Sequence, residues 1–169
     1  MCILHLLDEQ VDFSAYQSLL QVCLINRALS EAKLVHAHII QSAFKFNCIV
    51  KALPNKLLSV YAKCGNLIDG RRFLEQMPER NVVLWSIMIA AYSRASHGKE
   101  ALTLFNQMKG TGILPNQFTL SILLPACTHL EAVVEVYEEI IRSGFHSEVF
   151  VGNALIYMYT KYGKINTTR

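Results

Sequence analysis

The stretch that decides the fold is Asn81–Asn116, NVVLWSIMIAAYSRASHGKEALTLFNQMKGTGILPN. Its first half carries apolar residues at helical spacing, and Gly98 interrupts that pattern. The pattern then restarts on one face of a second helix, with Ala101, Leu104, Phe105 and Met108. Two glycines and a proline follow and end this helix. The stretch therefore predicts two short amphipathic helices joined by a turn, and neither helix could bury its apolar face without neighbours.

Similar units lie on both sides of this stretch. The apolar face of its second helix recurs 31 residues earlier, at Gly70, Phe73, Leu74 and Met77. Downstream, NALIYMYTKYGKI resembles NKLLSVYAKCGNL at a separation of 98 residues. FSAYQSLLQVCL resembles FTLSILLPACTHL, with Cys23 and Cys127 104 residues apart, and HAHIIQSAF resembles YEEIIRSGF at a separation of 101 residues. Self-similarity with a period of a little over thirty residues predicts a helical solenoid.

The repeats set the expected organisation of the chain. A lead-in over residues 1–12 precedes an array over 13–169, with repeats at 13–47, 51–81, 82–116 and 117–148 and a partial repeat at 149–169. In the first repeat we expect helices at Phe13–Ile25 and Ser30–Ser42. The repeat at 117–148 is three residues shorter than its counterpart around His129–Val134. We interpret this difference as a shortened turn and second helix.

Together these motifs resemble the pentatricopeptide repeat family, and within it the plant PLS subgroup, in which long, short and standard repeats alternate. The resemblance covers residues 13–169 and is carried by VYAKCGNL, QMPERNVVLWSIMIAAYSR, GKEALTLFNQMKGTGILPN and VFVGNALIYMYTKYG. The tetratricopeptide family has a similar period, but its signature of Trp, Leu-Gly and Tyr is absent. The resemblance implies an all-α fold, a right-handed superhelical solenoid of helix-turn-helix repeats whose first helices line the concave face.

The resemblance also implies RNA reading, with about one base contacted by each repeat. In the family, one reading residue lies in the first turn of the first helix and the other is the last residue of the repeat. The residues at these positions are Asn55, Asn81, Ser86, Asn116 and Asn153. Val83, with Ala52 and Phe150 as counterparts, stands where the family places an apolar residue against base faces. The alternative is that these Asn and Ser residues are helix N-caps and loop residues.

A base preference follows from the same resemblance. In the family a small hydroxyl with a final Asn goes with adenine, and paired Asn goes with pyrimidines. Residues 51–116 are therefore expected to prefer 5′-pyrimidine-adenine-3′. At Asn81 and Asn116 we expect the side-chain amide to accept a hydrogen bond from an exocyclic amino group of the base.

Several classes of function find no support in the sequence. There is no Gly-rich phosphate loop or G-x-S-x-G motif, and His146–Glu148 matches only the start of a zinc deaminase signature, without the Pro-Cys-x-x-Cys that must follow. The five cysteines form no C-x-x-C pair, so we expect reduced thiols. We therefore expect no catalysis, no cofactor and no metal. The aromatic residues at helical spacing are expected in the core, not on a stacking platform: Tyr61, Trp85, Tyr92, Phe105 and Tyr159.

The remaining expectations concern partners and location. A net charge of +3 permits a nucleic-acid partner without requiring one. The longest uncharged run, Gly110–Leu130, contains prolines, so no membrane span is expected, and no targeting peptide is visible. The family resemblance implies binding of single-stranded RNA in mitochondria or chloroplasts, for RNA processing or the choice of cytidine-to-uridine editing sites, together with other RNA-processing proteins. The alternative is a protein-interaction scaffold. We also expect self-association through the partial repeat at 149–169, whose second helix has barely begun.

Overall fold

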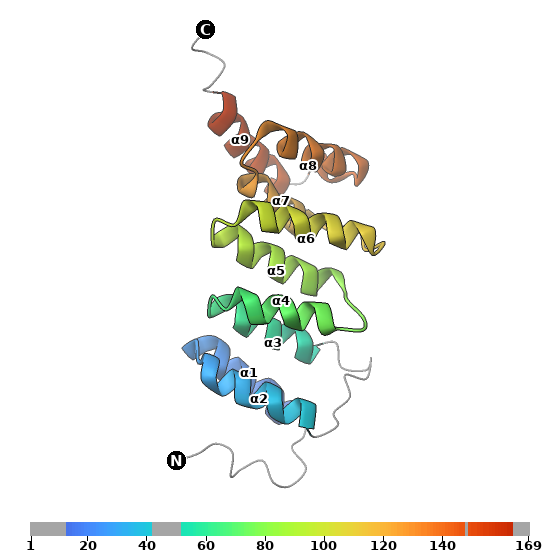
Figure 1. The fold of residues 1–169 in the computed structure, drawn as a ribbon. Helices are drawn as coiled ribbons and strands as arrows, with labels where there is room; N and C mark the ends of the chain where they lie inside the picture. The colour runs from blue at the N-terminus through green and yellow to red at the C-terminus, as the bar shows by residue number, and fades with distance from the viewer. Residues whose placement is uncertain (1–12, 42–51, 148, 164–169) are drawn as a thin grey trace. The chain divides into compact units, whose positions relative to one another are not determined.

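The regular elements of the chain are helices (Figure 1). The structure, a computed structural model, describes residues 13–41, 52–147 and 149–163, and no strand occurs in these ranges. In chain order the helices are α1 (Phe13–Asn26), α2 (Leu29–Gln41), α3 (Ala52–Lys63), α4 (Leu67–Gln76), α5 (Val82–Arg94), α6 (Gly98–Gly110), α7 (Gln117–Ala126), α8 (Leu130–Arg142), the short 3-10 helix η2 (Phe145–Ser147) and α9 (Val149–Gly163). The predicted all-α fold of paired helices is confirmed. The chain divides into two compact units, residues 1–73 and 74–169.

In the first unit, α1 packs against both α2 and α3. Its core is built from side chains with almost no exposed surface: Tyr16, Leu20, Ile39, Leu57 and Leu58. Each of these helices contributes one apolar face at helical spacing, which is why the repeat pattern alone could place them. Helices α1 and α2 lie within one residue of the ranges expected from the sequence.

Two histidines of α2 bind tyrosines on the two helices beside it. Nδ1 of His38 lies 2.7 Å from the hydroxyl of Tyr16 on α1, and Nδ1 of His36 lies 2.8 Å from the hydroxyl of Tyr61 on α3. Burial lowers the pKa of His36, and burial followed by the nearby Asp69 raises the pKa of Tyr61 to about 12. Both partners of the second pair are therefore neutral near pH 7, and the tautomer of His36 sets whether the phenol O–H or the Nδ1–H is the donor.

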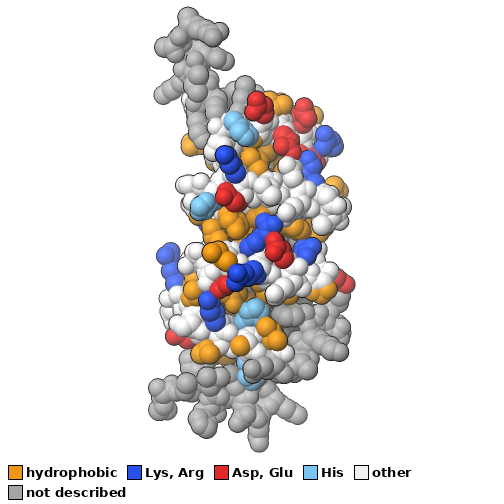
Figure 2. Space-filling model, viewed as in Figure 1, with side chains coloured by type: hydrophobic (Ala, Val, Ile, Leu, Met, Phe, Trp, Pro, Cys, Tyr) orange, Lys and Arg blue, Asp and Glu red, His pale blue; other side chains and the backbone are white. Residues whose placement is uncertain are grey.

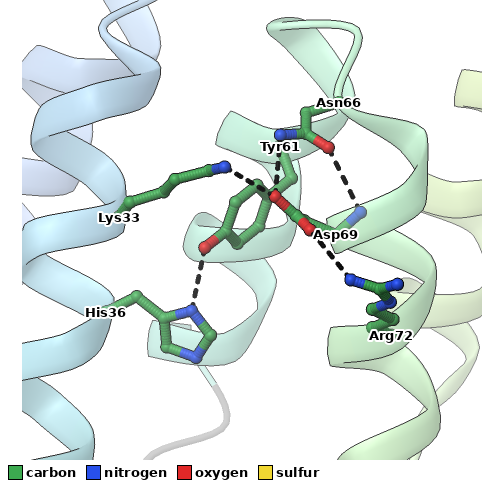
Figure 3. Close-up of polar contacts among 6 residues, drawn as sticks. All are labelled: Lys33, His36, Tyr61, Asn66, Asp69 and Arg72. Carbon is green, nitrogen blue, oxygen red and sulfur yellow. Dashed lines mark hydrogen bonds and ion pairs between the residues drawn. The ribbon is translucent and has the colours of Figure 1, made fainter.

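Asp69 joins α2 to the start of α4 (Figure 3). Its carboxylate lies 2.7 Å from Nζ of Lys33 and accepts a hydrogen bond from Nδ2 of Asn66 at 2.9 Å. The backbone N–H of Asp69 in turn donates to Oδ1 of Asn66, so Asn66 and Asp69 bind each other at the first turn of α4. The hydrogen bonds from Lys33 and Asn66 hold the pKa of Asp69 below its usual value.

In the second unit, α5 packs against α6 and α7, and α7 packs against α9. Leu104 and Phe105 have no exposed surface, as the repeated apolar face predicts, and Trp85 is also buried. Tyr61 of the first unit is buried and Tyr92 is half-buried, whereas the Tyr159 side chain lies outside the described residues. The expectation of a core role is thus confirmed for Tyr61, Trp85 and Phe105.

The shorter repeat at 117–148 departs from the expectation. Helix α8 has 13 residues, the same length as α2, so the second helix is not shortened. The first helix of this repeat is shortened instead, because α7 has 10 residues where α1 has 14. Pro125 lies in the last turn of α7, and the chain leaves the helix at Cys127 with an extended backbone. A proline supplies no N–H to its helix, which favours an early end there.

The first three turns between paired helices each contain a residue with a left-handed backbone. Arg27 follows α1 with a φ of 53°, Gly65 follows α3 with a φ of 74°, and Ser96 lies between α5 and α6 with a φ of 64°. Only glycine adopts this conformation without steric cost. The first and third turns therefore hold strain that the second avoids.

Arg80 fixes the chain between α4 and α5. Its guanidinium donates to the backbone oxygens of Leu74 and Glu75 at 2.9 and 2.6 Å, near the end of α4. The same group lies 5.9 Å from the ring centroid of Trp85, whose Nε1 is buried and has no hydrogen-bond partner among the described residues. Arg80 thus satisfies carbonyls at a helix end and covers an aromatic face at once.

Candidate nucleic-acid interface

Two of the proposed reading residues are N-caps. Oδ1 of Asn81 accepts a hydrogen bond from the backbone N–H of Leu84 at 2.9 Å, and Oδ1 of Asn116 accepts one from Thr119 at 2.9 Å. Both Asn residues have extended backbones and stand immediately before α5 and α7. Asn is favoured there because its side chain satisfies an N–H that the first turn of a helix leaves unpaired. The last residue of one repeat is thus the N-cap of the next, as the alternative interpretation expected.

Capping determines which atom of Asn116 remains for a ligand. Its Oδ1 also accepts a hydrogen bond from Oγ1 of Thr119 at 2.8 Å, so both acceptor sites of the amide oxygen are used. The group left for a base is Nδ2, which can only donate. These two contacts compete with the expected acceptance of a hydrogen bond from an exocyclic amino group by the same oxygen.

The structure brings Ser86 and Asn116 together through Thr119. The Ser86 hydroxyl lies 2.6 Å from Oγ1 of Thr119 and 2.6 Å from the backbone oxygen of Val82. Ser86 is only 4% exposed and Thr119 has no exposed surface. The hydroxyl of Ser86 is thus bound within the protein.

Apolar side chains stand exposed beside this polar cluster. Val83, the second residue of α5, is 43% exposed, and Phe118, the second residue of α7, is 53% exposed. Large apolar side chains at corresponding positions of two packed first helices are suited to contact the two faces of a flat ring. Sequence reasoning missed Phe118, although it stands 35 residues after Val83 at the same place in the next repeat.

The other candidate residues are placed separately. Asn55 lies in the first turns of α3, in the first unit, and its Oδ1 is buried without a hydrogen-bond partner among the described residues. Asn153 lies on α9 and is exposed. Ala52 is the exposed first residue of α3, and the Phe150 side chain lies outside the described residues. The structure therefore joins Ser86 with Asn116 through Thr119.

Charged side chains of the second unit pair on α6 and α8, the second helices of their repeats. Over α6 and α8, acidic and basic side chains lie close together (Figure 2). Glu139 on α8 is buried and lies 3.1 Å from Nζ of Lys109 on α6 and 2.6 Å from a guanidinium nitrogen of Arg142. Lys109 thus links α6 to α8 through this buried carboxylate, and Arg142 adds a second cation from α8 itself.

Two negative findings apply to the part of the chain that the structure describes. No three His, Cys, Asp or Glu side chains within it lie where they could hold a metal ion. None of its helices combines the length and the apolar character that a membrane crossing requires.

The repeats match known family models. A model described as the PPR repeat family matches residues 80–129, and one described as a PPR repeat matches residues 55–82. The chain is 36% identical to a putative mitochondrial pentatricopeptide repeat-containing protein of Arabidopsis thaliana, over 97% of this chain and 26% of that protein. It is 32% identical to a chloroplastic pentatricopeptide repeat-containing protein of the same plant, over 87% of this chain and 24% of that protein. It thus spans about a quarter of the length of such relatives.

Solved structures show the same fold. The crystal structure of the pentatricopeptide repeat protein PPR10 from maize matches with a TM-score of 0.71 and 20% identity, over 97% of this chain and 24% of that one. PPR10 in complex with an 18-nt psaJ RNA element matches with a TM-score of 0.69 and 22% identity, over 94% and 25%. Repeat models, relatives and fold agree, and the chain belongs to the pentatricopeptide repeat family.

Proposed function

We propose that the chain binds single-stranded RNA, with about one nucleotide taken by each complete repeat. The observation that carries this proposal is the arrangement at the starts of α5 and α7. There Ser86 and Asn116 are joined through Thr119, and Val83 and Phe118 are exposed beside them. Exposed apolar groups can contact the faces of a base, and a fixed amide can bind its edge. The likeness to PPR10, which was crystallised with RNA, supports the same function.

The geometry favours adenine at the repeat 82–116. Adenine and cytosine present a ring nitrogen that accepts a hydrogen bond at the centre of their pairing edge, whereas guanine and uracil present an N–H there. Nδ2 of Asn116 can only donate, so it favours adenine or cytosine. Ser86 is small and leaves room for the larger ring of a purine. With a pyrimidine expected at the repeat 51–81, the preferred dinucleotide is 5′-pyrimidine-adenine-3′.

Within this proposal the chain selects a site on RNA and leaves catalysis to another protein. The organellar names of its relatives support a place in the mitochondrion or the chloroplast. Its order of repeat types resembles that of the PLS subgroup, for which cytidine-to-uridine editing or other RNA processing is the expected role. Further RNA-processing proteins would then act on the bound transcript.

The test is selection from a random single-stranded RNA pool, followed by affinity measurements at about 50 and about 200 mM salt. We expect enrichment of pyrimidine-adenine, and weaker binding at the higher salt because counterions are released from the RNA. Val83→Ala should weaken binding, and Val134→Ala should not, because Val134 has a similar exposure but lies on α8. No binding at low salt would refute the proposal and favour a protein-interaction scaffold.

A further inference from the structure

Thr119 stands at the centre of the polar cluster, although it is not itself a candidate reading residue. It is the third residue of α7 and has no exposed surface. Its Oγ1 lies 2.6 Å from Oγ of Ser86 and 2.8 Å from Oδ1 of Asn116. A buried hydroxyl thus connects the two reading residues of the repeat 82–116 from within the following repeat.

The cluster has fewer hydroxyl protons than short oxygen–oxygen contacts. Ser86 and Thr119 have one hydroxyl proton each, whereas three short contacts run from Val82 O through Oγ of Ser86 and Oγ1 of Thr119 to Oδ1 of Asn116. Both hydroxyls can point toward Asn116, or both can point toward Val82. Only the first arrangement gives Oδ1 of Asn116 its second donor. The direction in which the Ser86 hydroxyl points therefore influences how firmly the Asn116 amide is held.

Asn81 offers an internal comparison. Its Oδ1 caps α5 through the backbone N–H of Leu84, as Oδ1 of Asn116 caps α7 through that of Thr119. Leu84 occupies the place of Thr119 and has no hydroxyl, so the cap at Asn81 contains one hydrogen bond where the cap at Asn116 contains two. The added hydroxyl is thus a local feature of the repeat junction at Asn116, beyond what capping needs.

We propose that Thr119 is a positioning residue for base selection: it fixes the Asn116 amide with Nδ2 toward the base and couples it to Ser86. This inference rests on the proposed RNA-binding function. When the Thr119 hydroxyl donates to Oδ1, both acceptor sites of Oδ1 are occupied and the amide can only donate. Without this hydroxyl, one acceptor site becomes available to the N–H of guanine or uracil. Loss of the hydroxyl should therefore weaken discrimination against these two bases at one nucleotide.

The experiment compares four RNAs that differ only at the nucleotide contacted by the repeat 82–116. The variants are Thr119→Val, which replaces the hydroxyl by a methyl group, and Thr119→Ser, which keeps the hydroxyl. We expect Thr119→Val to narrow the preference for adenine over guanine roughly fivefold, the factor that one hydrogen bond of ordinary net strength supplies. Thr119→Ser should retain the wild-type preference. Thr103→Val is the control, because Thr103 is exposed on α6 and its hydroxyl binds only its own helix.

The outcomes separate the inference from the proposed function. Equal binding of all four RNAs by the wild type, or no binding, refutes RNA reading itself. Discrimination that is unchanged in Thr119→Val overturns only the role of Thr119, as does a uniform loss of affinity that leaves the base ratios unchanged. Binding ratios between RNAs do not depend on the fraction of folded protein, so partial unfolding of a variant does not obscure the result.

A second measurement needs no variant. The side-chain NH₂ groups of Asn116 and Asn81 can be compared by NMR relaxation in the free wild-type protein. Two hydrogen bonds to Oδ1 should give the Asn116 amide a higher order parameter than the Asn81 amide, which has one. Equal or lower order at Asn116 would contradict the proposed positioning.

Discussion

Gly98, the first residue of α6, lies directly against the carbonyl oxygen of Ala126, the last residue of α7. A methyl group on Gly98 would collide with this oxygen, which belongs to the backbone and cannot rotate away. The close approach lets the start of a second helix contact the end of the next first helix. It also explains why a residue of low helix propensity opens α6.

The first prediction compares two glycines of α6. Gly98→Ala should destabilise the protein by about 2 kcal/mol, the usual scale of overpacking, because α6 and α7 must move apart. Gly110→Ala should be neutral or stabilise by up to about 1 kcal/mol, since a methyl group there meets no neighbour within 4 Å. Chemical denaturation followed by circular dichroism checks both. Equal effects of the two substitutions would show that the contact with Ala126 is unimportant.

The second prediction compares two phenylalanines of the second unit. Phe105 has no exposed surface, so Phe105→Ala should cost about 3–5 kcal/mol of stability. Phe118 is 53% exposed, so Phe118→Ala should change the melting temperature little and instead weaken RNA binding. A thermal melt and a binding titration on each variant suffice. Unimpaired RNA affinity in Phe118→Ala would remove this side chain from the interface.

The third prediction concerns the left-handed turns. Ser96→Gly should stabilise by up to about 1 kcal/mol, because a φ of 64° is strained for serine and not for glycine. The converse change, Gly65→Ala, should destabilise by about 1 kcal/mol, and it tests backbone strain alone because no atom lies within 4 Å of the added carbon. The denaturation midpoints of the two variants should therefore shift in opposite directions. A shift in the same direction would show that φ is not the controlling variable.

The fourth prediction is a pH dependence of the first unit. The pKa of His36 is lowered by burial, so below its usual value near 6.5 the unfolded chain binds more protons than the folded one. Stability therefore falls as the pH drops below that value, by at most about 1.4 kcal/mol per pH unit for one proton. Asp69 adds a loss of the same sign at lower pH, because the hydrogen bonds from Lys33 and Asn66 depress its pKa in the folded state.

Hydrogen exchange of α2 and α3 amides between pH 7.5 and 5.5 measures this dependence. His36→Gln keeps a group that can accept a hydrogen bond from Tyr61 but does not titrate, so it should flatten the pH dependence. His97→Gln is the control, since the His97 side chain is 54% exposed and lies in the second unit. A slope unchanged by His36→Gln would assign the effect to other groups.

The fifth prediction concerns base preference. Ser86→Asn should shift the preference at the nucleotide of the repeat 82–116 from adenine toward a pyrimidine, because the longer side chain fills the space of a purine. Ser86 is only 4% exposed, so some loss of stability, about 1–3 kcal/mol, should accompany the change. Ser121→Asn, at the same place in the next repeat, should leave this nucleotide's preference unchanged. Identical orders of base preference in wild type and Ser86→Asn would leave Ser86 with a structural role only.

Local patterns predicted most of the helices, because an apolar face at helical spacing needs no knowledge of distant contacts. Leu104 and Phe105 were placed correctly in the core for this reason. The length of α7 was not predictable in the same way. The sequence shows that three residues are missing, but which helix loses them depends on where the chain turns, and Cys127 turns it earlier than the repeat pattern indicates.

The sequence indicated which positions form the candidate site, but it did not indicate all the hydrogen bonds that their side chains make. The resemblance selected Ser86 and Asn116, and the alternative that Asn116 is an N-cap was also visible in the sequence. The link between Ser86 and Asn116 through Thr119 was not visible in the sequence. Thr119 lies 33 residues from Ser86, and the two side chains meet only because α5 packs on α7. Oδ1 of Asn116 is occupied by local contacts with Thr119 in the first turn of α7, and these contacts compete with the expected acceptor role of the amide.

The buried indole of Trp85 has a practical consequence. It is the only tryptophan in the chain, and it lies in the second unit, one residue before Ser86 and under the guanidinium of Arg80. An indole excluded from water emits at shorter wavelength, so its fluorescence should shift to the red when the second unit unfolds. Excitation at 295 nm would follow that unit alone, and ligand-induced changes in this emission would report on the turn of α5 that holds Ser86.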